Sequence, residues 1–190
     1  MKEKQEIRKK FKKMRDEMSP AQAADLSVCI CENIITSRLF ASVSLLYAYH
    51  PLGNEVDVRP AVLEAWRLGK RVAFPKVFGD EMRYFEVSSF EEFSKGAFGV
   101  MEPCTEHPVD WRSDRSALVL TPGVVFDRNG NRMGFGKGYY DRYFSGDHDC
   151  VLLGVAYELQ MADQLPAGKL DVPLPWLVTE NKLQNSKMFL

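Results

Sequence analysis

The sequence predicts an α/β domain whose central sheet is mainly parallel and covered by helices on both faces. Apolar segments of strand length alternate along the chain with segments of helical periodicity, which is typical of parallel strands joined by helices. The chain has 190 residues, of which 45% are hydrophobic and 27% charged, and these are ordinary values for one globular domain. We therefore expect a single domain over residues 1–190 with a three-layer α/β/α, Rossmann-like architecture.

Two helices are expected at the start of the chain. Four apolar residues share one face of the first helix, over residues 3–17, at intervals of four, three and four: Ile7, Phe11, Met14 and Met18. Ser19 and Pro20 are the residue types preferred at the N-cap and first position of a helix. A second helix is therefore predicted from Pro20 to about Ser37.

Strands and helices then alternate. Six segments are apolar or alternate with a period of two, as strands do: 43–49, 71–74, 82–87, 117–121, 151–156 and 177–179. A helix is expected over residues 59–68, because its apolar residues recur at helical spacing and Gly69 follows. Pro75 is expected to end the strand before it, since proline cannot donate to a ladder.

Two connecting segments are also expected. Ser88 and Ser89 favour a helical turn that continues through Phe93. Gly96–Asp114 has two prolines and no clear period, which predicts a long surface loop.

Composition and charge exclude several classes of protein. No apolar run approaches the roughly 18 residues that span a bilayer, and the N-terminus is charged, so we expect no membrane partner and a cytoplasmic location. Residues 1–19 hold eight Lys or Arg against four Asp or Glu, whereas the whole chain has a net charge of −1. This balance argues against nucleic acid as the main partner and favours small-molecule partners. We expect a monomer. The four cysteines lack metal-ligand spacing and are expected to be buried, reduced thiols.

The segment 121–144, TPGVVFDRNGNRMGFGKGYYDRYF, is the most informative for function. Three glycines occupy alternate positions, Gly134, Gly136 and Gly138, and leave backbone N–H groups free to converge on an anion. Arg132 and Lys137 add positive charge, and Asp141 can hold a divalent cation against the same anion. A helix that begins near Gly138 would direct further N–H groups to this place. The pattern predicts a nucleotide-phosphate loop that ends in a metal ligand.

Other known loops do not fit this segment. Asn131 stands where a GxxxxGK[ST] loop needs glycine, and Tyr139 stands at the last glycine of GxGxxG. Arg132 stands where an EF-hand loop needs glycine. A glycine-rich turn without a ligand stays possible, although such a turn needs neither the two basic residues nor the acid.

The residues from Arg132 to Asp141, RMGFGKGYYD, resemble the signature R-[LIM]-G-x-G-x-G-Y-Y-D of the 5-formyltetrahydrofolate cyclo-ligases, also called 5,10-methenyltetrahydrofolate synthetases. Weaker resemblances follow in the family's order over nearly the whole chain, and they comprise the opening helix with Lys4 and Arg8, the segment Glu55–Val56–Asp57, the strand and turn from Leu120 to Asp127, and the closing segment from Asp171 to Glu180.

This resemblance implies an enzyme that uses ATP and Mg²⁺ to convert 5-formyltetrahydrofolate to 5,10-methenyltetrahydrofolate, with release of ADP and phosphate. It implies that the formyl oxygen attacks the γ-phosphate, that N10 attacks the activated carbon, and that phosphate leaves. The residues fit this demand, because phosphoryl transfer needs mainly positioning and charge neutralisation. No nucleophilic side chain is required, which is consistent with direct transfer.

Each site residue receives an expected role by its match to the family. Lys137 and Arg132 are expected to be catalytic, by neutralising charge on the transferred phosphate. The expected ATP-binding residues are Lys4, Arg8, Arg132, Met133, Gly134, Phe135, Gly136, Lys137, Gly138, Tyr139 and Tyr140. The expected substrate-binding residues are His50, Glu55, Phe135, Gly136, Lys137, Gly138 and Tyr139. The expected metal ligands are Asp141 and Asp171.

Glu55 is the best candidate for recognition of the substrate, because a carboxylate can accept two parallel hydrogen bonds from the pterin amino group and the adjacent ring N–H. Structural explanations stay open for other residues. Tyr139 and Tyr140 could be core anchors, and Asp141 could be a first-turn acid favoured by the helix dipole. Glu55 and the loop that contains Gly134, Gly136 and Gly138, called the glycine loop below, each follow a predicted parallel strand. Both are therefore expected to line the crevice at the carboxyl ends of the strands.

Three other functions stay open at this stage. The first is an ATP-dependent enzyme that acts on a different formyl or amide substrate. The second is a nucleotide-binding or RNA-binding module that uses the basic N-terminal helix, with binding that weakens as salt rises. The third is a sugar-phosphate isomerase-like domain in which Glu55 is the general base. Dependence on ATP separates the third from the others.

Overall fold

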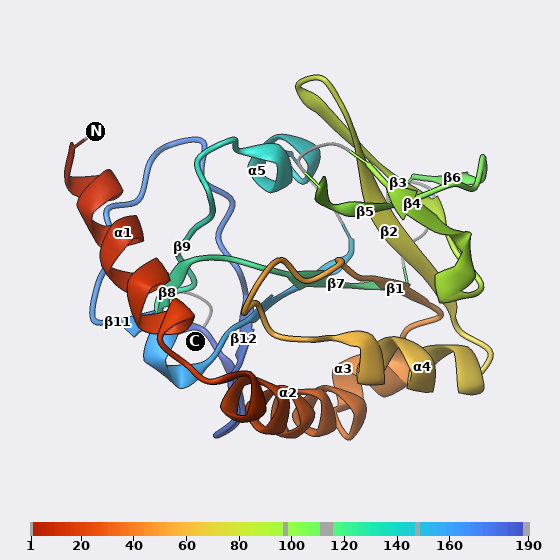
Figure 1. Ribbon diagram of the computed structural model, residues 1–190, viewed down its shortest axis with the longest axis horizontal. Helices are drawn as coiled ribbons and strands as arrows, with labels where there is room; N and C mark the ends of the chain where they lie inside the picture. Colours follow the sequence, from red (N-terminus) through yellow and green to blue (C-terminus); the bar gives the residue numbers. More distant parts are fainter. Residues whose placement is uncertain (1, 97–98, 111–115, 147–148, 188–190) are drawn as a thin grey trace.

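A computed structural model describes residues 2–96, 99–110, 116–146 and 149–187. In this part of the chain an eight-stranded sheet forms the centre of the molecule (Figure 1), in the order β13-β12-β10-β7-β1-β2-β3-β6. The neighbouring strands at its centre are parallel, and they are β12 (Trp176–Val178), β10 (Val151–Val155), β7 (Ala117–Thr121), β1 (Leu45–Tyr47) and β2 (Arg71–Phe78). Antiparallel strands complete both edges, and they are β13 (Leu183–Asn185), β3 (Glu81–Glu86) and β6 (Pro108–Val109). The predicted mainly parallel sheet is confirmed.

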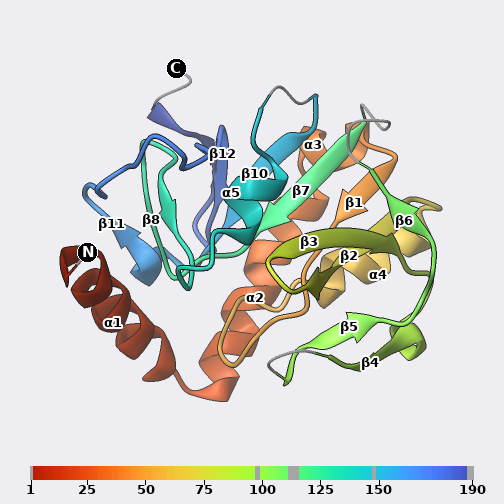
Figure 2. The same cartoon turned by 90° about the horizontal axis from the view of Figure 1, so that it is seen from above.

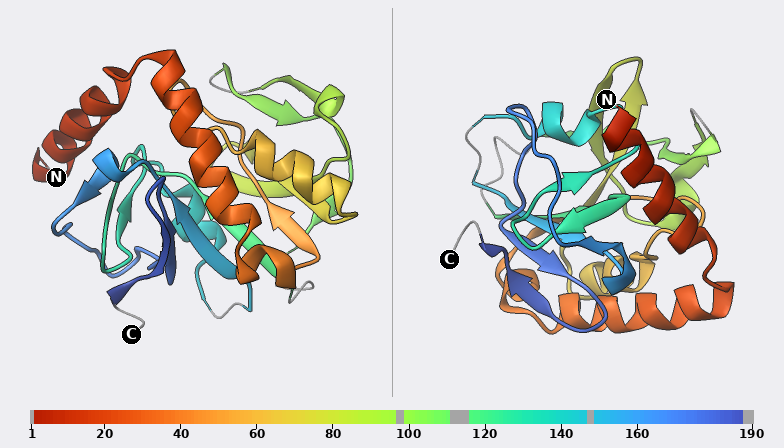
Figure 3. Two further views of the ribbon diagram at one scale, coloured as in Figure 1. Left: turned by 90° about the horizontal axis from the view of Figure 1, so that it is seen from below. Right: turned by 90° about the vertical axis from the view of Figure 1, so that its left-hand side faces the viewer.

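Helices cover one face of this sheet, as Figures 1 and 3 show, and they are α2 (Pro20–Ile35), α3 (Arg38–Ser42) and α4 (Arg59–Arg67). Their apolar residues pack on the strand side chains that point to this face, as Ile30 and Val62 do against Leu46 and Leu118. The opposite face carries the short helix α5 (Tyr139–Tyr143), beneath which the aromatic residues Tyr47, Tyr84 and Phe144 form a second cluster.

Helix α1 (Lys2–Asp16) stands apart from the central sheet, with a second, three-stranded sheet beside it (Figures 1 and 2). This small sheet has the order β11-β8-β9 and comprises Met161–Ala162, Val125–Asp127 and Arg132–Met133. Phe11 packs here on Val125, Met133 and Leu165, which form a third apolar cluster. The helix therefore docks on the segments around the glycine loop rather than on the sheet itself.

Most of the predicted elements are confirmed. Ser19 caps α2 by accepting a hydrogen bond from the Gln22 N–H, and the Gln22 side chain accepts in return from the Ser19 N–H. This reciprocal capping box satisfies two backbone donors that the first turn leaves unpaired. The helical turn after Ser89 is the 3₁₀ helix η1 (Phe90–Glu92).

The inward face of α1 differs from the predicted stripe. Ile7, Phe11 and Met18 are buried or partly buried, but Met14 is 37% exposed and Arg15 is only 2% exposed. The inward positions are spaced by four, four and three residues, so Arg15 takes the place that apolar patterning assigns to Met14.

The predicted end of the strand at Pro75 is wrong, because β2 continues to Phe78 and pairs with β3 along this length. The backbone N–H groups of Arg71 and Val77 point to the side of β2 that faces β1, so the alternation puts the Pro75 nitrogen on that side. β1 pairs with β2 only as far as Ala73, and no ladder donor is needed beyond it.

Several short elements were not predicted. Among them are α3, β13 and the small sheet, whose strands have two or three residues each, too few for a period to be recognised. β4 (Phe93–Lys95) and β5 (Met101–Pro103) form a separate hairpin. β5 and β6 interrupt the loop predicted over Gly96–Asp114, of which residues 97–98 and 111–114 lie outside the described residues. In the described part of the chain, no helix combines the length and the apolar character that crossing a bilayer requires.

Candidate active site

A cavity of about 480 Å³ lies beyond the carboxyl ends of the parallel strands. Its walls include His50 and Glu55 after β1, Pro122 and Gly123 after β7, and Val77 near the end of β2. The chain leaves β1 toward β2 on one side and later returns to place β7 on the other side, so β1 and β7 form the point at which strand order reverses. Open α/β sheets bind ligands at this point. The predicted crevice is confirmed.

Every residue predicted for the site lines this one cavity. They come from four separate stretches of the chain, and they are Lys4, Arg8, His50, Glu55, Arg132, Met133, Gly134, Phe135, Gly136, Lys137, Gly138, Tyr139, Tyr140, Asp141 and Asp171. Because α1, the segment after β1, the glycine loop and the segment near residue 171 are far apart in sequence, only the tertiary fold brings them together.

The glycine loop connects β9 to α5, and its backbone explains two of its glycines. Gly136 has φ +99° and Gly138 has φ +66°, conformations that side-chain-bearing residues rarely adopt. Arg8 lies over the loop, because its Nε donates to the Gly134 carbonyl at 2.8 Å and its guanidinium carbon lies 3.7 Å from where a Cβ at Gly136 would stand. The loop is therefore shaped for close approach from the helix α1 side.

Lys137 is exposed at the cavity wall, and within the described ranges its ammonium group has no hydrogen-bond or ion-pair partner. Its carbonyl accepts a hydrogen bond from Arg142 at 2.6 Å, and the same guanidinium donates to the Asp80 carbonyl at 2.8 Å. The backbone of Lys137 is thus tied to the tip of the β2–β3 hairpin while its side chain stays available. The predicted helix does begin after Gly138, but α5 has only five residues and supplies little dipole.

Arg132 and Asp141 form an ion pair with 3.2 Å between Nη1 and Oδ1. The Arg132 side chain is 5% exposed, donates to the Val172 carbonyl at 3.3 Å and lies 5.6 Å from the centre of the Tyr140 ring. The Val172 N–H donates to the same Asp141 oxygen at 3.1 Å. Arg132 therefore holds Asp141 and the 171–172 segment in place, and its expected contact with phosphate stays a prediction.

Lys4 and Asp171 form a second ion pair, with 3.2 Å between Nζ and Oδ2. The Gly168 N–H donates to the same Asp171 oxygen at 2.7 Å. Within the described residues, Oδ1 of Asp171 and Oδ2 of Asp141 accept no hydrogen bond. Since Val172 joins the two aspartates, each presents one uncommitted carboxylate oxygen in the same region of the cavity.

Tyr139 and Tyr140 serve both the cavity and the packing of α5. The Tyr139 hydroxyl donates to the Gly79 carbonyl at 3.0 Å, which fastens α5 to the β2–β3 hairpin. Tyr140 packs on Phe144, and burial raises the pKa of its hydroxyl far above the ordinary value. Both rings line the cavity wall, so the structural explanation and the ligand-contact explanation hold together.

Glu55 is a buried carboxylate, 8% exposed, whose side chain lines the cavity. Its Oε2 accepts from the Leu52 N–H at 3.0 Å, and its Oε1 lies 3.7 Å from Nη1 of Arg15. Burial raises the pKa of Glu55, while the Leu52 N–H and the Arg15 charge act in the opposite direction. A buried carboxylate that faces a cavity is suited to pairing with ring N–H donors.

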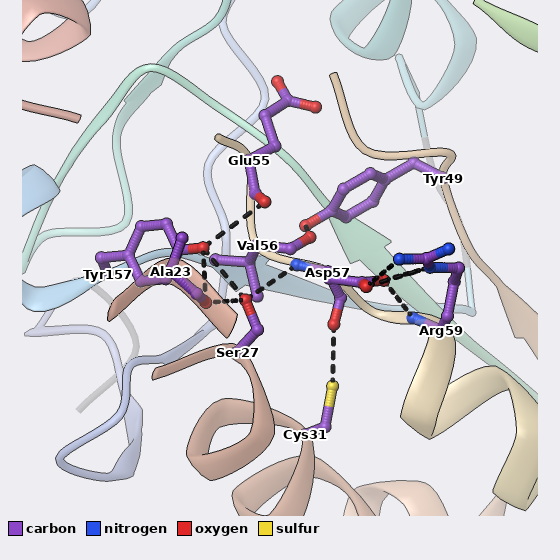
Figure 4. Close-up of polar contacts among 9 residues, drawn as sticks. All are labelled: Ala23, Ser27, Cys31, Tyr49, Glu55, Val56, Asp57, Arg59 and Tyr157. Atoms are coloured by element: carbon purple, nitrogen blue, oxygen red, sulfur yellow. Dashed lines mark hydrogen bonds and ion pairs between the residues drawn. The ribbon is translucent and has the colours of Figure 1, made fainter. Parts of the chain in front are cut away.

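The backbone around Glu55 is fixed by buried side chains (Figure 4). The Tyr157 hydroxyl donates to the Glu55 carbonyl at 3.4 Å, and the Tyr49 hydroxyl donates to the Val56 carbonyl at 3.0 Å. The Asp57 N–H donates to Ser27 Oγ at 3.0 Å. The three residues of this segment are therefore each held by a hydrogen bond to a side chain from another element. The Glu55 carboxylate points away from these contacts in Figure 4.

His50 also lines the cavity, 5.9 Å from the Phe93 ring between centroids, and burial lowers its pKa. A substrate role for His50 stays a prediction.

Sequence reasoning missed several residues that line the cavity and one that lies behind its wall. Val100, Met101 and Glu102 of the β4–β5 hairpin form one wall, and no local motif distinguished them from a surface loop. Arg15 contacts Glu55 from α1, where it resembles one more charge in a charged helix. Its helical spacing of eight residues from Ile7 is the signal that could have identified it.

Comparisons with known proteins agree with this geometry. Residues 1–180 match the model of the 5-formyltetrahydrofolate cyclo-ligase family. A probable 5-formyltetrahydrofolate cyclo-ligase of Caenorhabditis elegans is 27% identical, over 94% of this chain and 93% of its own length. The 5-formyltetrahydrofolate cyclo-ligase of Escherichia coli K12 is 24% identical, over 91% of this chain and 98% of its own length.

Two solved structures are also similar. The NMR structure of 5,10-methenyltetrahydrofolate synthetase from Aquifex aeolicus has a TM-score of 0.83 and 34% identity, covering 97% of this chain and 93% of that one. A 5,10-methenyltetrahydrofolate synthetase from Mycoplasma pneumoniae has a TM-score of 0.74 at 24% identity, covering 93% and 98%, and supports the fold alone. With its signature loop, its cavity and a family match over residues 1–180, this chain belongs to the 5-formyltetrahydrofolate cyclo-ligase family.

Proposed function

We propose that this protein converts 5-formyltetrahydrofolate and ATP to 5,10-methenyltetrahydrofolate, ADP and phosphate. The observation that carries the proposal is the convergence of fifteen predicted site residues on one cavity at the strand-order reversal. Membership of the cyclo-ligase family supports the choice of substrate. A finer description of the fold, as three-layer and Rossmann-like, is supported by helices on both faces of the sheet. The monomeric state and the cytoplasmic location stay predictions.

The triphosphate is proposed to lie along the glycine loop, with Lys4 and Arg8 reaching it from α1. Arg8 already contacts the loop through Gly134, so a phosphate on the loop would meet its guanidinium without a large movement. The ammonium group of Lys137 contributes a positive charge to the cavity, and no carboxylate of the described residues neutralises it. A preorganised donor of this kind stabilises charge that develops on the transferred phosphate.

The residues present fit a magnesium ion. Asp141 and Asp171 are proposed to hold it, since Mg²⁺ typically takes one or two carboxylates together with phosphates and waters. When bound, the ion would neutralise phosphate charge.

The chemistry proposed follows from the substrate. The formyl oxygen of an N-formyl group is a weak nucleophile, and its carbon is a weak electrophile until that oxygen is phosphorylated. Attack of this oxygen on the γ-phosphate breaks the bond to ADP. N10 then attacks the activated carbon, loses its proton, and phosphate leaves with the former formyl oxygen. The protein contributes position and charge, with Lys137 at the transferred group.

Glu55 is proposed to bind the pterin ring of the folate. Its buried carboxylate matches the pterin amino group and the adjacent ring N–H, which are two parallel donors. The exposed aromatic ring of Phe135 and the ring of Tyr139 line the same cavity and would contact the reduced ring system.

The test mixes purified protein, ATP, magnesium and 5-formyltetrahydrofolate, and follows the near-ultraviolet absorbance of the conjugated product. We expect an increase that requires ATP, is lost with Lys137→Ala and persists with the matched control Lys9→Ala, an exposed lysine on α1. Folded wild-type protein that binds ATP and gives no product would contradict the folate assignment and leave the nucleotide assignment standing.

A further inference from the structure

Arg15 is a buried arginine beside the cavity. It lies near the end of α1, is 2% exposed, and directs Nη1 to Glu55 Oε1 at 3.7 Å and to the Gly123 carbonyl at 3.5 Å. Its guanidinium carbon lies 6.0 Å from the centre of the Phe135 ring. Arg15 therefore contacts the proposed pterin-binding residue, the turn after β7 and the glycine loop.

Structural stability does not account for this arrangement. Desolvation of a buried ion pair is repaid only where geometry is good and the remaining donors are satisfied. The distance to Glu55 exceeds that of a hydrogen bond, and Arg15 Nε has no partner among the described residues. An apolar side chain at this inward position of α1 would fill the space without these costs. A role for the guanidinium charge at the cavity accounts for this arrangement better than packing does.

The segment that carries Glu55 does not need Arg15 to hold its backbone. Tyr157, Tyr49 and Ser27 already bond to residues 55–57 (Figure 4). The Asn54 side chain donates to the Arg15 and Met18 carbonyls at 3.3 and 3.2 Å, which fastens the end of α1 to this segment. These contacts fix the backbone of the segment, but they do not determine the charge of the Glu55 carboxylate.

Few charged groups contact that carboxylate directly. Arg15 is its ion-pair partner in the described part of the chain, Tyr49 and Tyr140 interact with it electrostatically, and Tyr157 bonds to the Glu55 backbone carbonyl. The titratable ring of His50 and the cations of Arg132 and Lys137 line the same cavity. Burial raises the pKa of each of these tyrosines, so they stay neutral across the working range. Burial also raises the pKa of Glu55 itself, and the Arg15 charge opposes that shift.

We propose that Arg15 is a positioning residue for substrate recognition, which keeps the Glu55 carboxylate ionised and directed into the cavity. The inference rests on the proposed role of Glu55. It adds that α1 serves both ends of the site, with Lys4 and Arg8 at the nucleotide end and Arg15 behind the pterin end.

The test compares Arg15→Met and Arg15→Lys with wild type in the same absorbance assay, with KM for 5-formyltetrahydrofolate measured from pH 6 to 9. Because recognition needs the carboxylate, KM rises as the pH falls through the pKa of Glu55. Loss of the Arg15 charge raises that pKa, so the increase in KM begins at a higher pH. We expect KM at neutral pH to increase about tenfold in Arg15→Met for each unit by which the pKa moves above the assay pH.

The Arg15→Lys variant keeps a charge and is expected to restore most of the wild-type profile. KM for ATP is expected to stay near its wild-type value in both variants, and Lys9→Met, an exposed lysine on the same helix, should match wild type throughout. A role limited to docking α1 would instead raise KM for ATP as well, because Lys4 and Arg8 would move, and would leave the pH profile unchanged. That result overturns the inference.

A double-mutant cycle separates this inference from the proposed function. If Arg15 acts through Glu55, Arg15→Met has no further effect on folate KM in a Glu55→Gln background. Both charges are absent from this double variant, so no buried charge without a partner destabilises the fold. Additive losses overturn the inference alone. An unchanged folate KM in the single variant Glu55→Gln overturns the proposed role of Glu55, and the inference with it.

Discussion

Lys4 and Asp171 are separated by 167 positions in the sequence, yet they form an ion pair at 3.2 Å in the wall of the cavity. The pair is about one-third exposed on each side, so its own contribution to stability is small. Its importance is positional, because it joins α1 to the segment that also holds Asp141 through Val172.

The Lys4–Asp171 pair predicts the effect of Asp171→Asn. The variant should raise the magnesium concentration needed for half-maximal rate, since one of two proposed ligands loses its charge, and leave the melting temperature nearly unchanged. Activity measured against magnesium at fixed ATP gives the answer. Asp163→Asn, an exposed aspartate in a neighbouring loop, is the control. Identical magnesium curves for Asp171→Asn and Asp163→Asn would contradict the ligand assignment.

Lys137→Ala should lower kcat by about 10²–10³-fold, the usual cost of removing one preorganised donor from a site of developing charge. The unfolding midpoint should not change, because this side chain is exposed and its ammonium has no partner in the described ranges. Steady-state kinetics and urea denaturation measure the two quantities. A variant with wild-type kcat would show that the phosphate is neutralised elsewhere.

Gly136→Ala and Gly146→Ala form a matched pair. Both glycines have a positive φ, +99° and +91°, so each substitution should destabilise the fold by about 1–2 kcal/mol. Only Gly136 lies beside Arg8 in the cavity, whereas a Cβ at Gly146 meets no atom within 4 Å. KM for ATP should therefore rise in Gly136→Ala alone. Equal KM values in the two variants would mean that the loop does not contact the nucleotide.

Tyr157→Phe tests the support beneath Glu55. It removes a buried hydroxyl that contacts Ser27 and the Ala23 and Glu55 carbonyls, and it should cost about 1–3 kcal/mol of unfolding free energy. KM for the folate should rise as the segment loosens, while KM for ATP should not. Ser94→Ala, at an exposed position of β4, is the control for both measurements.

The four thiols should separate into two classes toward a thiol reagent at pH 8. Cys29 and Cys104 are exposed, whereas Cys31 and Cys150 are buried, so the prediction of four buried thiols is wrong for the first two. Burial raises the pKa of Cys31 to about 12 and that of Cys150 to about 11, and thiolate is the reactive form. Two groups should react quickly in native protein and four after unfolding. Fast reaction of three or more in native protein would contradict the packing.

Much of this fold and site follows from local patterns. The N-cap at Ser19 and the alternation of strand and helix are local signals, and both are confirmed. The signature from Arg132 to Asp141 is a local signal as well, and the helix expected near Gly138 does begin there. The crevice was predictable as well, because the ends of parallel strands meet at one edge of the sheet.

The features that the sequence did not predict depend on contacts between residues that lie far apart in the chain. Whether Pro75 ends a strand depends on where β1 stops, and the strands of the small sheet are too short to show a period. Arg15 is inward because Glu55 lies opposite, and a helical pattern counts a charged residue as outward. The Cys29 thiol is exposed because of how α2 rotates on the sheet, which its sequence spacing alone does not fix.

The pairing of Lys4 with Asp171 also determines when the cavity is completed during folding. Segments that are made early wait for partners that are made later. The Lys4–Asp171 ion pair and the Val172–Asp141 hydrogen bond join α1 and α5 to residues 171–172. A chain that has formed β1, β2 and β7 but has not yet placed residues 171–172 lacks this wall, so the central sheet forms before the cavity is complete.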